Sequence, residues 1–350
     1  MKKSEDKYSV GAEQEKSGKR RKEAHIGRRL LSVLLVTAML STLLPPIFRG
    51  KGVKAETATF LQWSAVSLGY HYSAAITTNG DLYCWGENGD GQIGNGTTVT
   101  QTTPVKVLGN VSVVSLGGYY SAAITTNGDL YCWGLNNYGQ VGNGTTINQT
   151  APVKVLGNVS AVSLGYYHSA AITTNGDLYC WGCNKYGGVG DGTTATQTTP
   201  VKVLGNVSAV SLVYYNSAAI TTNGDLYCWG VNEHGQVGNG TTVTQTTPVK
   251  VLGNVSAVSL GIDHSAALTT NGDLYCWGEN GDGQVGNGTT IDQKTPVKVL
   301  GNVSAVSLGY YHSAAITTNG DLYCWGVNEH GQVGNGTTVT QTPPLPVLSE

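Results

Sequence analysis

A repeat of 48 residues constrains this chain of 350 residues more than any other feature. Tryptophan returns at that interval within the phrase D-L-Y-C-W-G, at Trp85, Trp133, Trp181, Trp229, Trp277 and Trp325. Six copies fill the sequence from residue 65 onward, as 65–112, 113–160, 161–208, 209–256, 257–304 and 305–350. A period of this size is typical of solenoids, propellers and other repeat arrays. Nearly identical units form an extended surface more readily than a single catalytic cleft.

Each copy has the pattern of four short strands. Between residues 150 and 182 they are expected at Pro152–Leu156, Val159–Leu164, Ser169–Thr173 and Asp177–Trp181. An Asn-Gly pair before the last strand favours a tight hairpin, and no part of the repeat shows helical periodicity. The repeat therefore predicts an all-β fold, a β-propeller of four-stranded blades.

The two ends of the repeat region predict how the propeller closes. The first copy has only the weak stretch Thr57–Leu61 where later copies have Pro-Val-Lys-Val, whereas the last copy continues into Leu345–Leu348. Three strands at the start, five sets of four and one final strand make 24 strands, or six blades. We expect Leu345–Leu348 to complete the first blade, which would leave no open sheet edge.

Residues 1–55 have the features of a secretory signal peptide, which leaves residues 56–350 as the propeller. A basic stretch precedes the apolar run Leu30–Leu44, and Ala55 ends a small-residue cleavage site. Fifteen apolar residues are short for a membrane span, so membrane attachment is expected only if the segment stays uncleaved. The long basic start favours a Gram-positive bacterial host, and we expect a secreted or cell-surface protein.

The charge of the exported part argues against nucleic-acid binding. After residue 55 the chain has seven lysines, no arginine and 17 acidic residues, a net charge of −10. Proteins that bind nucleic acid cluster Lys and Arg to neutralise phosphates, but 13 of the 20 basic residues of this chain lie in the export segment. No nucleic-acid partner is expected.

The chemically reactive side chains indicate neither an enzyme nor a metal site. Six of the seven cysteines occupy one repeated position, and equivalent positions of neighbouring repeats are too far apart for a disulfide. Cys183 departs from that pattern, but no second Cys or His pair completes a zinc site with Cys180 and Cys183. Each His of the G-x-x-H-S phrases precedes a Ser, yet neighbouring residues of a strand point to opposite sides. We expect no catalytic residues, no metal and no cofactor.

Strand order divides the loops between the two faces of the disk. If neighbouring strands are antiparallel, the Leu-Gly-Asn and Asn-Gly-Asp turns share one face, and the G-x-x-x-S turns and Trp-to-Pro connections share the other. Only the second set varies much, since Tyr70-His71-Tyr72 corresponds to Ile262-Asp263-His264. Loops that vary on a constant frame indicate recognition.

The variable loops contain many tyrosines, which offer large, rigid contact areas with a polar tip. The candidate binding residues are Tyr70, Tyr72, Tyr119, Tyr120, Tyr138, Tyr166, Tyr167, Tyr186, Tyr214, Tyr215, His234, Tyr310, Tyr311 and His330. Some of them must lie in the core, because adjacent tyrosines cannot both point outward. We expect the six repeated tryptophans to have a structural role and to pack between blades.

The phrases G-x-x-H-S, N-G-D-L-Y-C-W-G and N-x-x-G-Q-V-G-N-G together resemble the repeats of the regulator of chromosome condensation family. The resemblance covers residues 65–350 in all six copies, and it implies a propeller that usually has seven blades, so six or seven are expected here. The best-known member is a nuclear exchange factor for a small GTPase, and secreted bacterial relatives include inhibitors that cap β-lactamases. This chain departs from the family in its six copies and in having the motif His only at His168, His264 and His312.

These features predict a secreted, monomeric binding module. An extracellular protein is the expected partner, bound in an inhibitor-like or other manner by the face with the G-x-x-x-S turns, and a glycan is the second choice. A guanine-nucleotide exchange factor follows only from the resemblance, because export and an acidic body remove the nuclear context. A propeller enzyme would need a unique carboxylate cluster or a metal near the axis, where the repeats offer only turn aspartates.

Overall fold

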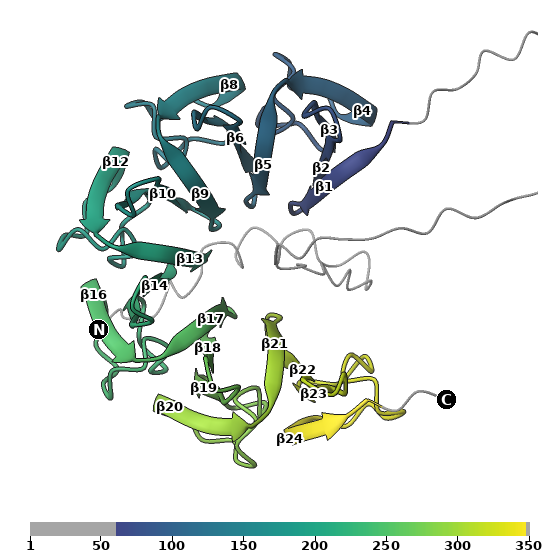
Figure 1. Cartoon of the computed structure of the whole chain (residues 1–350), viewed down its shortest axis with the longest axis vertical. Helices are drawn as coiled ribbons and strands as arrows, with labels where there is room; N and C mark the ends of the chain where they lie inside the picture. Colours follow the sequence, from purple (N-terminus) through teal and green to yellow (C-terminus); the bar gives the residue numbers. More distant parts are fainter. Residues whose placement is uncertain (1–60, 348–350) are drawn as a thin grey trace, which may run out of the picture.

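A computed structural model describes residues 61–347 of the chain. All regular structure in this range is β, with 24 strands in six antiparallel sheets of four. The sheets succeed one another around a common axis, with the first strand of each nearest the centre and the fourth at the rim (Figure 1). The expected propeller of four-stranded blades is confirmed, and residues 61–347 form six of them.

The strands keep nearly the same bounds from blade to blade, except that β13 is one residue longer than its counterparts and β24 is two residues shorter. The innermost strands are β1 (Trp63–Leu68), β5 (Val111–Leu116), β9 (Val159–Leu164), β13 (Val207–Val213), β17 (Val255–Leu260) and β21 (Val303–Leu308). The second strands are β2 (Tyr72–Thr77), β6 (Tyr120–Thr125), β10 (His168–Thr173), β14 (Asn216–Thr221), β18 (His264–Thr269) and β22 (His312–Thr317). The third strands are β3 (Leu82–Gly86), β7 (Leu130–Gly134), β11 (Leu178–Gly182), β15 (Leu226–Gly230), β19 (Leu274–Gly278) and β23 (Leu322–Gly326). The outer strands are β4 (Gln101–Leu108), β8 (Gln149–Leu156), β12 (Gln197–Leu204), β16 (Gln245–Leu252), β20 (Gln293–Leu300) and β24 (Gln341–Pro346).

The predicted signal peptide, residues 1–55, lies outside the described residues. Within residues 61–347, no helix has the length and apolar character needed to cross a membrane. The seven cysteines of this range are all buried and unbonded. Burial raises the pKa of the repeated thiols, Cys84 to about 12, so these side chains act as small apolar residues of the core.

The strands are grouped into blades differently from the sequence prediction. Each Pro-Val-Lys-Val strand pairs with the Leu-Tyr-Cys-Trp strand that precedes it, as in the partners Tyr83 and Lys106 of β3 and β4. The free edge of the third strand is therefore covered by the segment that follows it through the long connection. The Leu-Gly-Asn turn then links two blades rather than two strands of one sheet, and Asn110 adopts the left-handed φ of 57° that this link requires.

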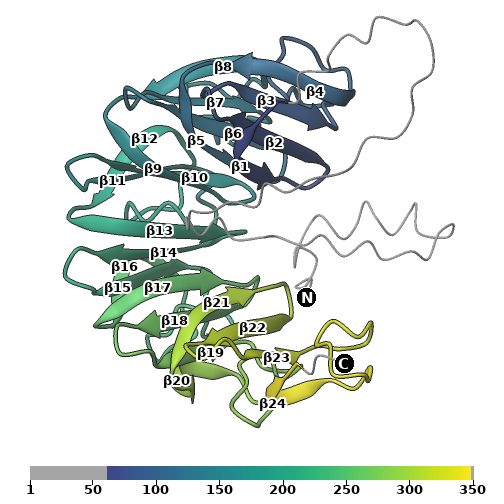
Figure 2. The ribbon, with the colours of Figure 1, turned by 45° about the vertical axis from the view of Figure 1, so that its right-hand side comes forward.

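This grouping overturns the predicted closure of the ring. β24 pairs with β23 in the sixth blade, while the first blade already has β4 as its outer strand, so Leu345–Leu348 does not complete the first blade. Leu348 and most of Thr57–Leu61 lie outside the described residues. The six blades form an arc with an opening between β1–β4 and β21–β24 (Figures 1 and 2).

Neighbouring blades are held by a shared hydrogen-bond acceptor, here called the blade joint. In the first joint, Ser121 Oγ and Trp133 Nε1 both donate to the main-chain carbonyl of Gln92, at 2.8 and 2.9 Å. The same two donors of each later blade bind one carbonyl of the blade before it, at Gln140, Gly188, Gln236 and Gln284. A buried indole N–H needs such an acceptor, so the tryptophan fixes the position of its neighbour.

An apolar layer surrounds each blade joint. Between the first two blades, Ile76 and Leu82 pack against Val114 and Trp133, and all four side chains are buried. The indole also excludes a side chain from the loop beneath it, because a Cβ on Gly94 would lie 2.5 Å from Trp133 Nε1. The glycine of the G-Q-V-G phrase is thus required by the approach of the next blade.

Removing a joint tryptophan is expected to unfold the ring more readily than removing Trp85. Trp181 is fully buried, so Trp181→Ala should lower the free energy of unfolding by about 3–5 kcal/mol. Trp85 lies on the open end of the first blade and is only half-buried, so Trp85→Ala should cost less than half as much. Urea denaturation followed by circular dichroism measures both. Equal losses would show that the blade joints do not carry the stability assigned to them.

Candidate functional site

Two kinds of loop meet on one face of the propeller. Because every blade is a sequence of antiparallel neighbours, the turn between its first and second strands lies beside the connection between its third and fourth strands. We call this side the tyrosine face and the opposite side, with the Asn-Gly-Asp turns, the hairpin face. The division of loops expected from the sequence follows directly from this topology.

Ten tyrosines of the tyrosine face form one continuous cluster of ring contacts. The tyrosine cluster consists of Tyr70, Tyr119, Tyr138, Tyr166, Tyr167, Tyr186, Tyr214, Tyr215, Tyr310 and Tyr311. Two pairs from neighbouring blades are stacked: Tyr166 on Tyr214 with centroids 4.8 Å apart, and Tyr167 on Tyr215 at 5.5 Å. The most exposed members are Tyr70, Tyr138 and Tyr311, whose side chains are each more than 40% exposed. The structure thus brings ten of the fourteen candidate residues together.

The turn at Tyr214 is bent more sharply than its counterparts. This blade has Val213 where the other turns begin with glycine, and Tyr214 takes a φ of 25°. Within residues 61–347, the only other non-glycine residues with positive φ are asparagines of the Leu-Gly-Asn links. A bulky residue in this region is strained, and stacking on Tyr166 helps to hold it there.

Burial keeps the inner phenol groups of the cluster neutral. Burial raises the pKa of Tyr167 to about 12, and burial likewise raises the pKa of Tyr166 and Tyr215. A neutral phenol donates and accepts a hydrogen bond beside its apolar ring. The surface therefore offers both apolar contact and directional polar tips.

Tyr72 and Tyr120 do not belong to this surface. Both rings are buried, and their hydroxyls cross to the next blade, where they donate to the main-chain carbonyls of Tyr120 at 2.5 Å and of His168 at 2.7 Å. Their expected place on the binding face is thus wrong for a physical reason. In these two turns the residue before the Ser points into the blade interface, and only the two residues before it reach the loop surface.

His168 and His264 occupy that same interface position. His168 Nε2 lies 2.8 Å from Ser217 Oγ of the next blade, and His264 Nε2 lies 3.1 Å from Ser313 Oγ. The Ser beside each His in its own strand is not its partner, and no local motif shows the pairing because the two residues lie 49 positions apart. Ser217 Oγ already donates to the carbonyl of Gly188. The pair fits a buried structural contact rather than an activated nucleophile.

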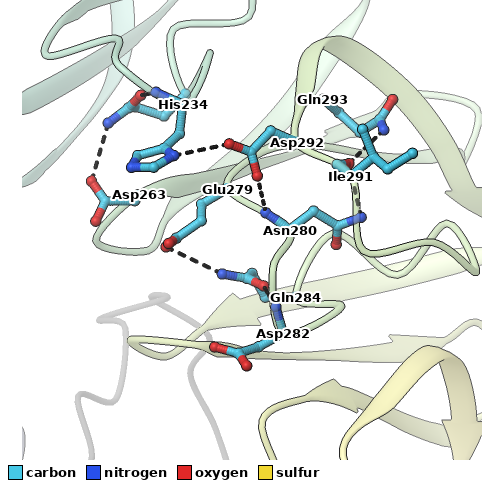
Figure 3. A network of polar contacts seen from close by, with 10 residues as sticks. His234, Asp263, Glu279, Asn280, Asp282, Gln284, Ile291, Asp292 and Gln293 are labelled. Atoms are coloured by element: carbon cyan, nitrogen blue, oxygen red, sulfur yellow. Dashed lines mark hydrogen bonds and ion pairs between the residues drawn. The ribbon is translucent and has the colours of Figure 1, made fainter.

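The fifth blade interrupts the tyrosines with carboxylates (Figure 3). His234 Nδ1 lies 2.9 Å from Asp292, while Gln236 donates to Asp263 and Gln284 to Glu279. In Figure 3 the carboxylates of Asp263 and Glu279 lie near the imidazole ring of His234. No sequence motif marked this group, because its acids come from a turn and a connection that lie far apart in the chain.

These carboxylates control the charge of His234. Burial lowers the pKa of this imidazole, but the bond to Asp292 and the charges of Glu279 and Asp263 outweigh burial and leave the pKa raised. Burial and the neighbouring acids also raise the pKa of Glu279. His234 is therefore the one candidate residue of the fourth blade that can add positive charge beside the acids.

The connections that bear the site are built on a buried asparagine. Asn136 Nδ2 donates to the carbonyls of Thr145 and Ile147, and its Oδ1 accepts from Val141 N. Asn88, Asn232, Asn280 and Asn328 make the same contacts, and Asn184 makes all but the bond to the second carbonyl, so a long loop without regular structure is held in one shape. Within residues 61–347 no group of three or more His, Cys, Asp or Glu side chains could hold a metal ion. His330, the remaining candidate, is exposed on the sixth blade.

A family model described as the RCC1-like domain matches residues 49–349. The chain belongs to the RCC1-like domain family. The expected likeness to regulator of chromosome condensation repeats is thus confirmed over nearly the whole repeat region.

Solved structures similar to this chain come from a human and a yeast protein. The crystal structure of human WBSCR16 has 25% sequence identity and a TM-score of 0.70, over 83% of this chain and 82% of the other. Prp20p from Saccharomyces cerevisiae has 22% identity and a TM-score of 0.69, over 82% and 77%. Yeast RCC1 (Prp20) bound to Kap60 has 22% identity and a TM-score of 0.68, over 82% and 75%. At these identities the yeast structures show a common fold.

Acid is expected to weaken the ring through His168. Burial lowers the pKa of this imidazole to about 4 from an ordinary value of 6.5. Between those values only the unfolded chain takes up the proton, so the free energy of unfolding falls as pH drops through this window. His168→Asn, which copies Asn216 of the next blade, should be less stable at neutral pH but lose less between pH 7 and pH 4.5. Parallel acid dependence of the two proteins in thermal melts would contradict this assignment.

Asp292 is expected to keep His234 protonated to higher pH. The pKa of His234 is raised in the folded state, so the stability from this pair is present at low pH and is lost as pH rises through that value. In Asp292→Asn the NMR titration midpoint of His234 should fall. Asp282→Asn, an exposed neighbouring change, serves as the control and should shift the midpoint less. An unchanged midpoint in Asp292→Asn would show that the pair does not form.

Proposed function

We propose that this protein is an exported binding module that holds a protein partner on its tyrosine face. The observation that carries the proposal is the tyrosine cluster, a continuous aromatic surface on loops that differ among otherwise matching blades. Tyrosine is enriched in protein contact surfaces because it combines a rigid apolar ring with a polar tip. The carboxylates around His234 extend this surface into the fifth blade.

Charge separates the two faces and indicates the character of the partner. On the hairpin face, five turn aspartates each pair with a lysine, as Asp177 does with Lys202 at 2.8 Å. The loops of the tyrosine face carry nine acidic residues against one lysine, Lys185, with Lys294 near the start of β20. The negative excess of the molecule therefore lies on the side of the tyrosines. A partner with a cationic contact surface is favoured, because Lys and Arg bind both carboxylates and aromatic faces.

The family supports a protein as the partner. Prp20p was studied for its binding to Gsp1p and histones, and yeast RCC1 (Prp20) has been solved with Kap60 bound. The fold is therefore one that other chains use to bind proteins, and we extend that use, without those partners, to this chain. Export rests on the features of residues 1–55. Capping of an extracellular protein by the tyrosine face, as an inhibitor would do, is one form of this function.

Loss of exposed tyrosines should weaken the partner without unfolding the protein. Tyr70→Ala and Tyr138→Ala remove open members of the cluster, and central contact tyrosines typically cost about 2 kcal/mol, or roughly 30-fold in Kd. The partner would be recovered from culture supernatant on the immobilised exported chain, and its affinity measured by calorimetry.

Asp177→Asn on the hairpin face is the matched control, because it breaks an ion pair without touching the tyrosine face. This variant should bind like the wild type. Full binding by the tyrosine variants, or a loss confined to Asp177→Asn, would place the function on the other face. Selective binding to a glycan array, with no protein recovered, would favour the carbohydrate alternative.

A further inference from the structure

The opening between the first and sixth blades has half of a blade joint on each side. On the first blade, Ser73 and Trp85 occupy the positions of the two joint donors, and neither the hydroxyl nor the indole N–H meets an acceptor among residues 61–347. On the sixth blade, Gln332 occupies the position of the joint acceptor and Gly334 that of the glycine under the indole. In the five closed joints this glycine lies against tryptophan, whereas Gly334 has only Val347 nearby.

The apolar layers beside these half joints are also uncovered. Val66 and Leu68 on the first blade are 65% and 44% exposed, whereas Val114 and Leu116 at the same positions of the second blade are 7% and 8% exposed. On the sixth blade Leu322 is 39% exposed, whereas Leu274 at the same position is fully buried. Both ends therefore expose the surfaces that neighbouring blades bury elsewhere in the same molecule.

The exposed end of the first blade is hollowed. A depression of about 410 Å³ is lined by Trp63, Ala65, Val66, Ala75 and Trp85, with Ser64. Trp63 stands where the other blades have valine, and its ring lies 5.7 Å from Tyr83 and 6.4 Å from Trp85. Large aromatic side chains at the centre of an exposed apolar patch are the residues that dominate protein contacts.

We propose that this opening is a second docking site, which receives a single four-stranded β-sheet of a partner polypeptide. The five closed interfaces define the chemistry of that partner. It presents a Gly-rich loop carbonyl to Ser73 and Trp85, an apolar face to Val66 and Leu68, and its own indole and hydroxyl donors to Gln332. A repeat of the kind that builds this propeller has all of these features. The site is separate from the tyrosine face and does not depend on the proposed function.

The shape of the arc and its packing argue against two other occupants. A second copy could place its sixth blade against the first blade here, but its remaining blades would then continue along the same curve toward the sixth blade already present (Figure 1). Closure of one chain on itself would require all five joints to change together. Those joints are tightly packed, since Trp133, Trp181, Trp229, Trp277 and Trp325 are fully buried on glycines without room for a Cβ.

Adding one repeat to the full chain tests whether the opening accepts one blade. A copy of residues 159–206 inserted between Asn302 and Val303 preserves every link of the ring. The seven-repeat chain should melt at least about 4 °C higher than the wild type, and acrylamide should quench less of its tryptophan fluorescence, because Trp85 becomes covered. A chain with two inserted repeats is the control and should gain neither property.

Docking from a second molecule is tested with a separate polypeptide of residues 159–206 titrated into the full chain. It should bind one to one, and Trp85→Ala should weaken binding at least 10-fold, whereas Val243→Ala, an exposed change in a distant loop, should not. A wild-type monomer whose Trp85 is already protected from acrylamide would show self-closure and overturn the proposal. Head-to-tail dimers in sedimentation, or a seven-repeat chain with no gain, would overturn it as well.

Discussion

The carbonyl oxygen that accepts both a serine hydroxyl and a tryptophan indole is the contact on which the rest of the ring depends. It places Trp133 over Gln92 and Gly94, and this arrangement recurs at every closed interface. A buried polar group left without its partner costs about 1–3 kcal/mol, so the two donors and the acceptor favour one relative position of the blades. The apolar layer of Ile76, Leu82 and Val114 then packs in a single register.

A constant frame allows the loops to differ. Asn136 holds its connection through contacts with main-chain atoms, so neighbouring side chains can change without altering the shape of the loop. The same loop position is Tyr138 in the second blade, His234 in the fourth and Asp282 in the fifth. Matching backbones thus carry aromatic, imidazole and carboxylate groups around one face. The tyrosine face therefore lacks the symmetry of the blades beneath it, because its side chains differ from one loop to the next.

The repeat made most of this fold predictable, because hairpin turns and strand alternation are local. The strands near residues 150–182 appear at the expected places, and the division of loops between faces follows from their order. The sequence alone could not show which strand pairs with the free edge of the third strand in each blade. Whether β8 pairs with β7 or joins the sheet of β9 depends on the three-dimensional path of the long connection. The same limit applies to Tyr120 and His168, whose partners belong to the next blade and lie 48 and 49 residues away.

The Leu-Gly-Asn links have a consequence for how such a protein changes over evolutionary time. Each link has the same left-handed asparagine, from Asn110 to Asn302, and it joins blades that are nearly identical. Unequal recombination between two repeats of the gene would remove or duplicate 48 residues without disturbing a single link, interface or loop scaffold. The circumference of the ring can therefore vary in whole steps while its chemistry stays fixed. In an open arc, the gain or loss of one repeat leaves the packing of the remaining blades unchanged.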